Sequence, residues 1–137
     1  MLRMIGSSYN ILSNGPPATA DEIDALITHF RGVPQEYLDL VTEATELELQ
    51  HNCGQYVRIW GPVGCIEMNE GYGIRRRIPD AIPIGDDGGS HVVFYSNGNN
   101  GIGLYHAGYG NLDQDDAVWI AATLDEFLTL GTGIKSF

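Results

Sequence analysis

Two histidines, His91 and His106, stand on the two arms of a predicted β-hairpin, and imidazole nitrogens are frequent metal ligands. A four-residue loop between the arms would place the two rings opposite one another, whereas a five-residue loop would break that pairing. The sequence specifies no third ligand beside them. We therefore expect a structural or surface role for the pair and no metal site. A small metal-dependent hydrolase that uses His91 and His106 is the alternative interpretation.

Three aspartates, Asp113, Asp115 and Asp116, have a spacing that resembles part of a calcium-binding loop. Such a loop also needs a central glycine and a distal bidentate glutamate followed by a helix. Residues 117–121 supply none of these features. We therefore predict a solvated acidic loop at this place.

Nucleophilic chemistry has little support in the sequence. Cys53 follows His51 by two residues, which could support a thiolate, but we expect both Cys53 and Cys65 to be small buried thiols. No serine stands in a G-x-S-x-G elbow, and neither glycine pair at residues 71–73 and 108–110 continues into a phosphate-binding loop. The chain is thus predicted to be non-enzymatic and to need no cofactor.

The charge balance is strongly acidic: 18 acids stand against 7 bases in 137 residues, a formal net charge of −11. A surface of this sign repels phosphate, so we expect neither nucleic acid nor an anionic membrane as a partner, whereas a basic protein would be attracted. The one basic cluster, Arg75 to Arg77, is expected to pair with the protein's own carboxylates. The sequence contains no long apolar run, and its first residues form no apolar leader, which predicts a cytoplasmic protein.

A fold must position these residues, and capping signals indicate where its helices begin. Thr19 and Glu22 form the T-x-x-E pattern of a capping box, and Thr123 and Glu126 repeat it near the C-terminus. Pro34 suits the start of a second helix, which completes an N-terminal helix pair. One face of that helix carries three carboxylates: Glu36, Asp39 and Glu43. They should repel one another unless another group stabilises their negative charge.

Strand signals occupy the middle of the chain. Alternation with a period of two begins near residue 46, although residues 46–50 could instead extend the second helix. Residues 78–84 contain two prolines and are therefore expected on a sheet edge. Further strands are expected at residues 56–60, 65–68, 91–95, 102–106 and 118–121. Helices, then strands, then a C-terminal helix predict an α+β fold with a central, mainly antiparallel, twisted sheet.

The length of the chain fits one domain and is enough to bury a core without metal or disulfide staples. We place this domain at residues 19–131. An N-terminal segment, residues 1–18, precedes it, and a C-terminal tail, residues 132–137, follows it.

Three stretches of the sequence match a family pattern in the same order. Residues 19–41 contain a helix followed by V-P-Q-E-Y-L, similar to a helix, L-P-x-x-Y and F-L pattern. Residues 82–89, I-P-I-G-D-D-G-G, resemble an I-G-x-D-G-G segment, and residues 118–128 resemble a closing strand and an S-F-x-E-F-L helix. These are patterns of the SUKH superfamily, which the chain resembles over residues 19–130. It departs from them after the second helix, where A-T-E-L replaces the common N-G-G turn.

The resemblance implies an α+β domain without enzyme chemistry. Bacterial SUKH members are typically immunity proteins that neutralise toxins, often nucleases, and fungal relatives regulate cell-wall synthesis. An acidic surface suits the first role, because the active-site cleft of a nuclease is lined with basic side chains. We therefore predict an immunity protein that binds a basic toxin, with a regulatory scaffold as the alternative. The expected contact residues are Asp86, Asp87, Tyr105, Tyr109, Asp113, Asp115 and Asp116. Asp86 and Asp87 equally suit a turn, and either tyrosine could instead belong to the core.

Overall fold

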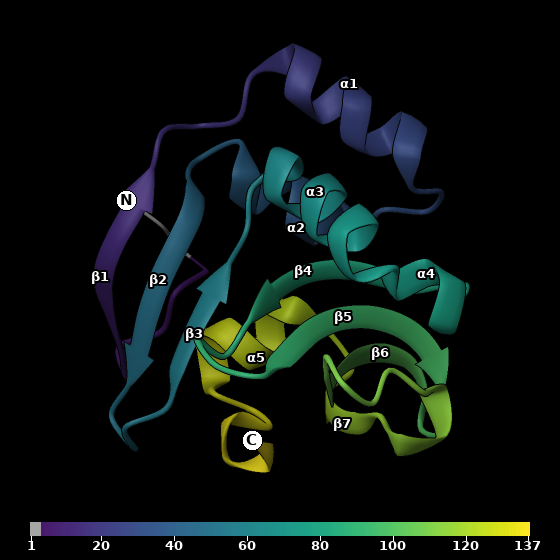
Figure 1. Cartoon of the computed structure of the whole chain (residues 1–137). Coiled ribbons are helices and arrows are strands. Elements are labelled where there is room, and N and C mark those ends of the chain that lie inside the picture. The colour runs from purple at the N-terminus through teal and green to yellow at the C-terminus, as the bar shows by residue number, and fades with distance from the viewer. Residues whose placement is uncertain (1–3) are drawn as a thin grey trace.

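Seven strands form one antiparallel sheet in residues 4–137, the part of the chain that this computed structural model describes. Each strand pairs with the next one along the chain, so the sheet is a meander (Figure 1). The strands are β1 Tyr9–Gly15, β2 Thr45–His51, β3 Tyr56–Ile59, β4 Ile82–Asp86, β5 His91–Gly98, β6 Gly101–Gly108 and β7 Val118–Ala121. The antiparallel sheet that we predicted is confirmed.

Five α-helices accompany this sheet within the described residues. They are α1 Ala20–His29, α2 Gln35–Val41, α3 Pro62–Tyr72, α4 Ile74–Arg77 and α5 Leu124–Leu130, with 3₁₀ turns at Gln114–Asp116 and Ile134–Ser136. The mixture of helices with an antiparallel sheet confirms the α+β class. None of the helices in residues 4–137 combines the length and the apolar character needed to cross a membrane.

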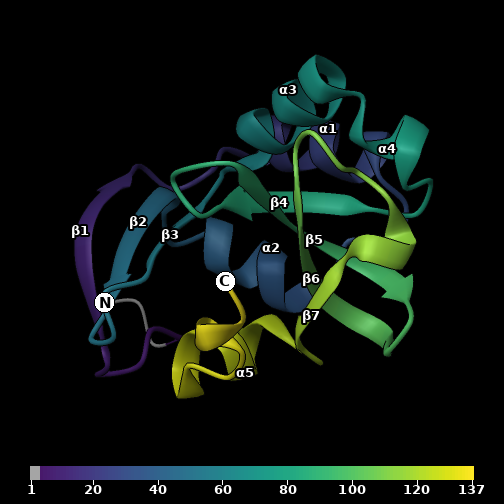
Figure 2. The same cartoon turned by 60° about the horizontal axis from the view of Figure 1, so that its bottom comes forward.

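The helices lie on both sides of the sheet. Figure 2 shows that the sheet curves around α2 and α5, while α1, α3 and α4 lie on the other side of β4. Accordingly α1 packs beside α3, α3 packs on β4, and α2 contacts α5. All five residues of β4 are buried. Covering both faces in this way explains why the central strands lack a regular alternation of apolar and polar residues.

The capping signals are confirmed by hydrogen bonds. At α1, Glu22 N donates to Thr19 Oγ1 at 3.2 Å, and Thr19 N donates to Glu22 Oε1 at 2.9 Å. At α5, Glu126 N donates to Thr123 Oγ1 at 3.1 Å. Gly131 then ends α5 with a φ of 72°, a left-handed conformation that glycine adopts without a steric penalty.

Residues 46–50, for which the sequence left helix and strand open, belong to β2. Leu47 and Leu49 are buried and pair with Ile59 and Val57 of β3. The polar residues between them face outward, which is the pattern of a strand with one covered face.

The expected domain limits, residues 19–131, leave out ordered parts at both ends. Residues 9–15 form β1, whose few apolar residues gave only a weak strand signal, and β1 is held in the sheet by pairing with β2. At the other end Ile134 is buried, and the Phe137 ring stacks on His106 with centroids 4.3 Å apart. The first two helices therefore follow a strand, and they pack with other helices, α1 with α3 and α2 with α5. The C-terminal tail belongs to the core.

Two strand predictions are wrong. Residues 65–68 lie in α3, which begins at Pro62 and interrupts the run of strands. Residues 82–86 form β4 between β3 and β5, so they lie at the centre of the sheet and not on an edge. A central strand tolerates Pro83 because the register with β5 shifts between Pro83 and Gly85. Pro79 precedes the strand.

Candidate binding surface

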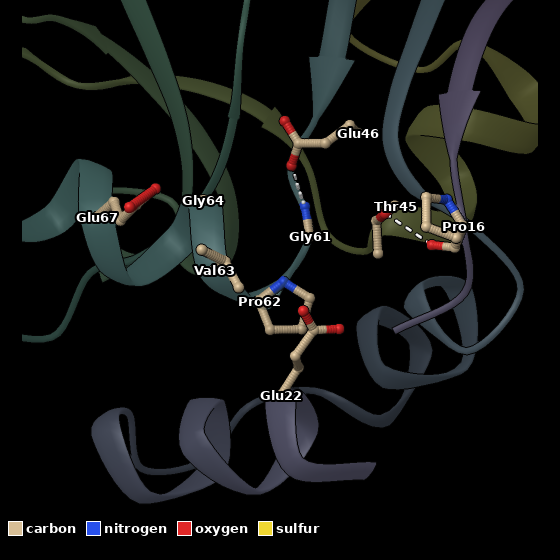
Figure 3. Close-up of a pocket in the computed structure, with 9 residues that line it drawn as sticks. All are labelled: Pro16, Glu22, Thr45, Glu46, Gly61, Pro62, Val63, Gly64 and Glu67. Carbon is tan, nitrogen blue, oxygen red and sulfur yellow. Dashed lines mark hydrogen bonds between the residues drawn. The ribbon is translucent and has the colours of Figure 1, made fainter. Parts of the chain in front are cut away.

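An acidic groove opens where α1, the beginning of β2 and the beginning of α3 meet (Figure 3). Its hollow measures about 280 Å³. Three carboxylates line it, and each comes from a different element: Glu22 from α1, Glu46 from β2 and Glu67 from α3. The complete lining of this acidic groove is Pro16, Glu22, Thr45, Glu46, Gly61, Pro62, Val63, Gly64 and Glu67.

Glu46 reaches the groove from an unusual backbone conformation. Its φ is 45°, the only left-handed value at a non-glycine residue in the described chain, and such a conformation costs about 1 kcal/mol. Its Oε2 accepts a hydrogen bond from Gly61 N at 2.7 Å, at the start of α3. A Cβ at Gly64 would lie 3.2 Å from the same oxygen, so glycine leaves room for the carboxylate.

The remaining rim of the groove is held by hydrogen bonds of the flanking turns. Thr45 Oγ1 donates to Pro16 O at 2.7 Å and so ties the end of β1 to β2. Glu22 uses Oε1 in the capping box of α1, and Figure 3 shows its side chain extending from the helix toward Pro62. The three carboxylates therefore project from positions that the fold determines.

Within residues 4–137, the carboxylates of the acidic groove have no basic side chain within 4.0 Å. In the described part of the chain, the only contacts within 4.0 Å between basic and acidic side chains are those of Arg58 with Asp86 and of His91 with Asp87. An amine or guanidinium from a partner would meet three carboxylates here and could form charge-assisted hydrogen bonds. Val63, whose surface is 49% exposed, offers an apolar contact for the methylene stem of the incoming side chain.

Asp86 and Asp87, which we predicted to contact a partner, serve the turn between β4 and β5. Asp86 is only 4% exposed; its Oδ2 accepts from Trp60 Nε1 at 2.8 Å, and its Oδ1 accepts from Gly88 N at 2.8 Å. Asp87 Oδ1 accepts from His91 N at 3.1 Å. The alternative interpretation, turn chemistry, is therefore what the structure shows.

Of the two tyrosines predicted to contact a partner, one is buried in the fold. Tyr105 is fully buried and donates its hydroxyl to Gly101 O at 2.6 Å, so the prediction that it contacts a partner is wrong. Tyr109 is half-buried and stacks on Tyr72 of α3, with ring centroids 4.1 Å apart. Tyr72 is 51% exposed, and Tyr109 remains a predicted contact residue beside it.

The acidic loop at Asp113, Asp115 and Asp116 is exposed. Two of its three carboxylates already act within the loop: Asp113 Oδ1 accepts from Asp115 N at 2.9 Å, and Asp116 Oδ2 accepts from Asn111 Nδ2 at 3.2 Å. In the acidic groove two of the three carboxylates, Glu22 and Glu46, are likewise engaged by backbone N–H groups, so the two surfaces do not differ in this respect.

The two histidines lie together, although not as directly opposite neighbours in the hairpin. The hairpin reverses through a loop of two residues, so His106 pairs with Val93 and His91 pairs with Gly108. Their rings nevertheless stack across the diagonal with centroids 5.0 Å apart.

The environment of His106 is that of a structural side chain. Its Nε2 donates to Ser136 O at 3.1 Å, Phe137 covers the ring, and burial lowers the pKa of His106. In residues 4–137 no three His, Cys, Asp or Glu side chains come together in a way that could hold a metal ion.

The two cysteines differ in environment. Cys65 is buried as predicted, and burial raises the pKa of its thiol to about 12. Cys53 is exposed, which corrects our prediction, because it lies in the short connection between β2 and β3. His51 Nδ1 accepts a hydrogen bond from the backbone N of Cys53 at 3.0 Å, so this nitrogen is engaged by the backbone.

Sequence reasoning did not single out the acidic groove. Glu46 was visible as an outward residue of an alternating segment, but Glu67 was assigned to a strand that does not exist. Residues 16, 22, 46 and 67 are far apart in sequence, and only the packing of α1, α3 and β2 brings them together.

Comparison with models of known protein families finds no match for this chain, and neither does comparison with curated proteins. The resemblance to the SUKH superfamily thus rests on the three sequence stretches described above.

Proposed function

We propose that this protein is a binding module that receives a basic partner in the acidic groove. The observation that carries this proposal is a hollow of about 280 Å³ lined by three carboxylates, none of which has a counter-ion among the residues that the structure describes. The net charge of −11 adds a long-range attraction that would speed association with a basic surface. A standard interface covers about 800 Å² on each partner, so the groove would form its centre and neighbouring parts of α1 and β2 its periphery.

We further propose that the partner is a toxin and that the protein is an immunity protein of the SUKH kind acting in the cytoplasm. The sequence resemblance and the acidic charge support this role. The cleft of a nuclease binds phosphate with lysine and arginine side chains, and the acidic groove would bind those side chains. A regulatory scaffold of the fungal kind would bind through the same electrostatic attraction but to a different partner.

The acidic groove is preferred over the loop at residues 113–116 as the contact surface. The groove gathers carboxylates from three elements around a hollow with an apolar contact, whereas the carboxylates of the loop come from one exposed segment. Contacts that bury charge and apolar surface together contribute most at the centre of an interface.

Survival of cells that express toxin domains tests the proposal. Each member of a panel of bacterial nuclease toxins would be expressed with the wild-type chain, and we expect protection against at least one of them. A triple variant with Glu22→Gln, Glu46→Gln and Glu67→Gln should lose that protection. Glutamine keeps the size and the acceptor oxygen of each residue and removes only the charge.

The matched control is a triple variant in the exposed loop, with Asp113→Asn, Asp115→Asn and Asp116→Asn. It removes the same number of charges and should retain protection. Equal protection by the groove variant and the wild-type chain, with circular dichroism showing both folded, would rule out the groove as the contact surface. Protection against no member of the panel would count against a nuclease toxin as partner.

A further inference from the structure

A basic corner lies at the opposite end of the α1–α3 pair from the acidic groove. At this end α1 terminates and α3 continues into α4 (Figure 1). Four of the seven lysines and arginines of the chain gather here: Arg31, Arg75, Arg76 and Arg77. In the described residues none of the four has a carboxylate within 4.0 Å, which contradicts the predicted pairing of residues 75–77 with the protein's own acids.

The basic corner contains a hollow of about 290 Å³. It is lined by His29, Asn69, Glu70, Gly73, Arg75 and Arg76. Most of these side chains carry hydrogen-bond donors, and two of them carry a permanent positive charge.

Asn69 adds a buried donor to this hollow. Its side chain is 9% exposed, and its Oδ1 is occupied by a hydrogen bond from Arg75 N at 3.0 Å. The amide nitrogen has two hydrogens, and its one contact in the described residues is His29 Nε2 at 3.5 Å. At least one N–H of Asn69 is therefore free for a ligand.

The guanidinium group of Arg75 is held in position, whereas the side chain of Arg76 is exposed. Arg75 donates from Nε to Pro79 O at 3.0 Å, and its guanidinium lies 5.4 Å from the centroid of the Phe30 ring. Arg76 folds back against Gly73, where a Cβ would come within 2.7 Å of one of its terminal nitrogens. Gly73 also has a φ of 62°, so both its backbone and its lack of a side chain shape this site.

We propose that this hollow binds a phosphoryl group, either as inorganic phosphate or as a small phosphate monoester. A tetrahedral dianion would neutralise two unpaired arginines, whose planar N–H groups match phosphate oxygens, and would accept the free N–H of Asn69. Glu70 is exposed and also lines the hollow, and its carboxylate favours a ligand that presents hydroxyl groups beside its phosphate. A polynucleotide would meet repulsion from the net charge of −11.

Nuclear magnetic resonance of the ¹⁵N-labelled full chain tests this proposal. Sodium phosphate and glycerol 3-phosphate would be titrated separately at constant ionic strength, with sodium chloride as the reference. We expect saturable shifts of the backbone amides of residues 69–76 and of the arginine Nε–H groups. Saturation with both ligands supports a general phosphoryl site, and saturation with one of them identifies the form that binds.

Two variants show whether the hollow itself is responsible. Arg76→Gln should weaken binding by roughly tenfold or more, as expected for the loss of a hydrogen bond to a charged group. Arg77→Gln removes an exposed charge of the same helix outside the hollow and should change the affinity by less than about threefold. Equal affinity of Arg76→Gln and the wild-type chain, or shifts that chloride reproduces, would overturn the proposal. Neither variant alters the acidic groove, so this result is independent of toxin protection.

Discussion

Glu36 shows how one side chain joins distant parts of the protein. The sequence predicts three mutually repelling carboxylates on α2, and in the structure Glu36 is stabilised by hydrogen-bond donors from other elements. Its Oε2 accepts hydrogen bonds from Tyr95 OH at 2.8 Å and from Leu124 N at 2.7 Å, and its Oε1 accepts one from Asp125 N at 3.1 Å. Glu36 thus connects α2 to β5 and satisfies backbone N–H groups at the start of α5.

Replacing this residue should therefore destabilise the fold. We expect Glu36→Ala to lower the free energy of unfolding by about 2 kcal/mol, because it leaves two backbone donors and a tyrosine hydroxyl without their acceptor. Asp39→Ala, on the same helix, removes an exposed carboxylate whose one hydrogen bond among residues 4–137 comes from Gln35, and it should cost less than about 0.5 kcal/mol. Urea unfolding of both variants makes the comparison, and equal losses would contradict this role of Glu36.

His106 predicts a pH dependence of stability. Burial lowers its pKa in the folded state below the ordinary value of about 6.5, so the unfolded chain binds a proton more readily. The stabilisation is complete above that pH and is lost as the pH falls toward the folded pKa. We expect the free energy of unfolding to decrease between about pH 7 and pH 5, apart from any contribution of carboxylates at still lower pH.

His106→Gln provides the control for this titration, because glutamine retains an N–H donor for Ser136 O but does not titrate. The decrease between neutral and mildly acidic pH should be smaller in this variant than in the wild-type chain. The same pH dependence in both proteins would assign the effect to another group.

At the scale of elements, the C-terminal turn is part of the core. Its position depends on close contact between the backbone of Gly133 and the backbone of β7. Gly133 has a φ of 79°, and a Cβ there would come within 2.0 Å of Ile120 O in β7. The approach places Ile134 in the core and Phe137 over His106. A larger residue at position 133 must push this turn away from the sheet.

We expect Gly133→Ala to lower the free energy of unfolding by about 2 kcal/mol or more, because it adds a steric clash to a left-handed backbone. Gly101→Ala separates these two causes. Gly101 has a φ of 92° with no atom within 4 Å of the added Cβ, so this variant should cost only about 1 kcal/mol. Thermal unfolding measures both, and a cost for Gly133→Ala no larger than that for Gly101→Ala would contradict the docked position of the turn.

Local signals predicted some elements and missed others for physical reasons. The capping residues Thr19 and Thr123 bond within their own helices, so their patterns are visible in the sequence alone. The helix α3 contains Gly64 and Gly71, which are poor helix formers, and tertiary packing against α1 and β4 must overcome this weakness. The acidic groove depends on that same packing, which explains why its residues could not be found by spacing.

At the scale of the whole molecule, the charges are separated along the α1–α3 pair. The acidic groove lies at the beginnings of the two helices, and the basic corner lies at their ends. Of the groove carboxylates, Glu22 lies in the first turn of α1, where the helix dipole favours a negative charge. A basic partner is therefore drawn to one end of this pair and repelled from the other, which would orient it during approach.

The central claim is that a basic partner binds in the acidic groove, and rates of association test it most directly. Stopped-flow measurements would use the toxin found by the survival screen, the wild-type chain and the Glu22→Gln, Glu46→Gln, Glu67→Gln variant, between about 0.05 and 0.5 M salt. We predict a wild-type rate that falls steeply with salt and a variant rate that is lower at low salt and less dependent on it. Identical rates for the two proteins at every salt concentration would contradict the claim.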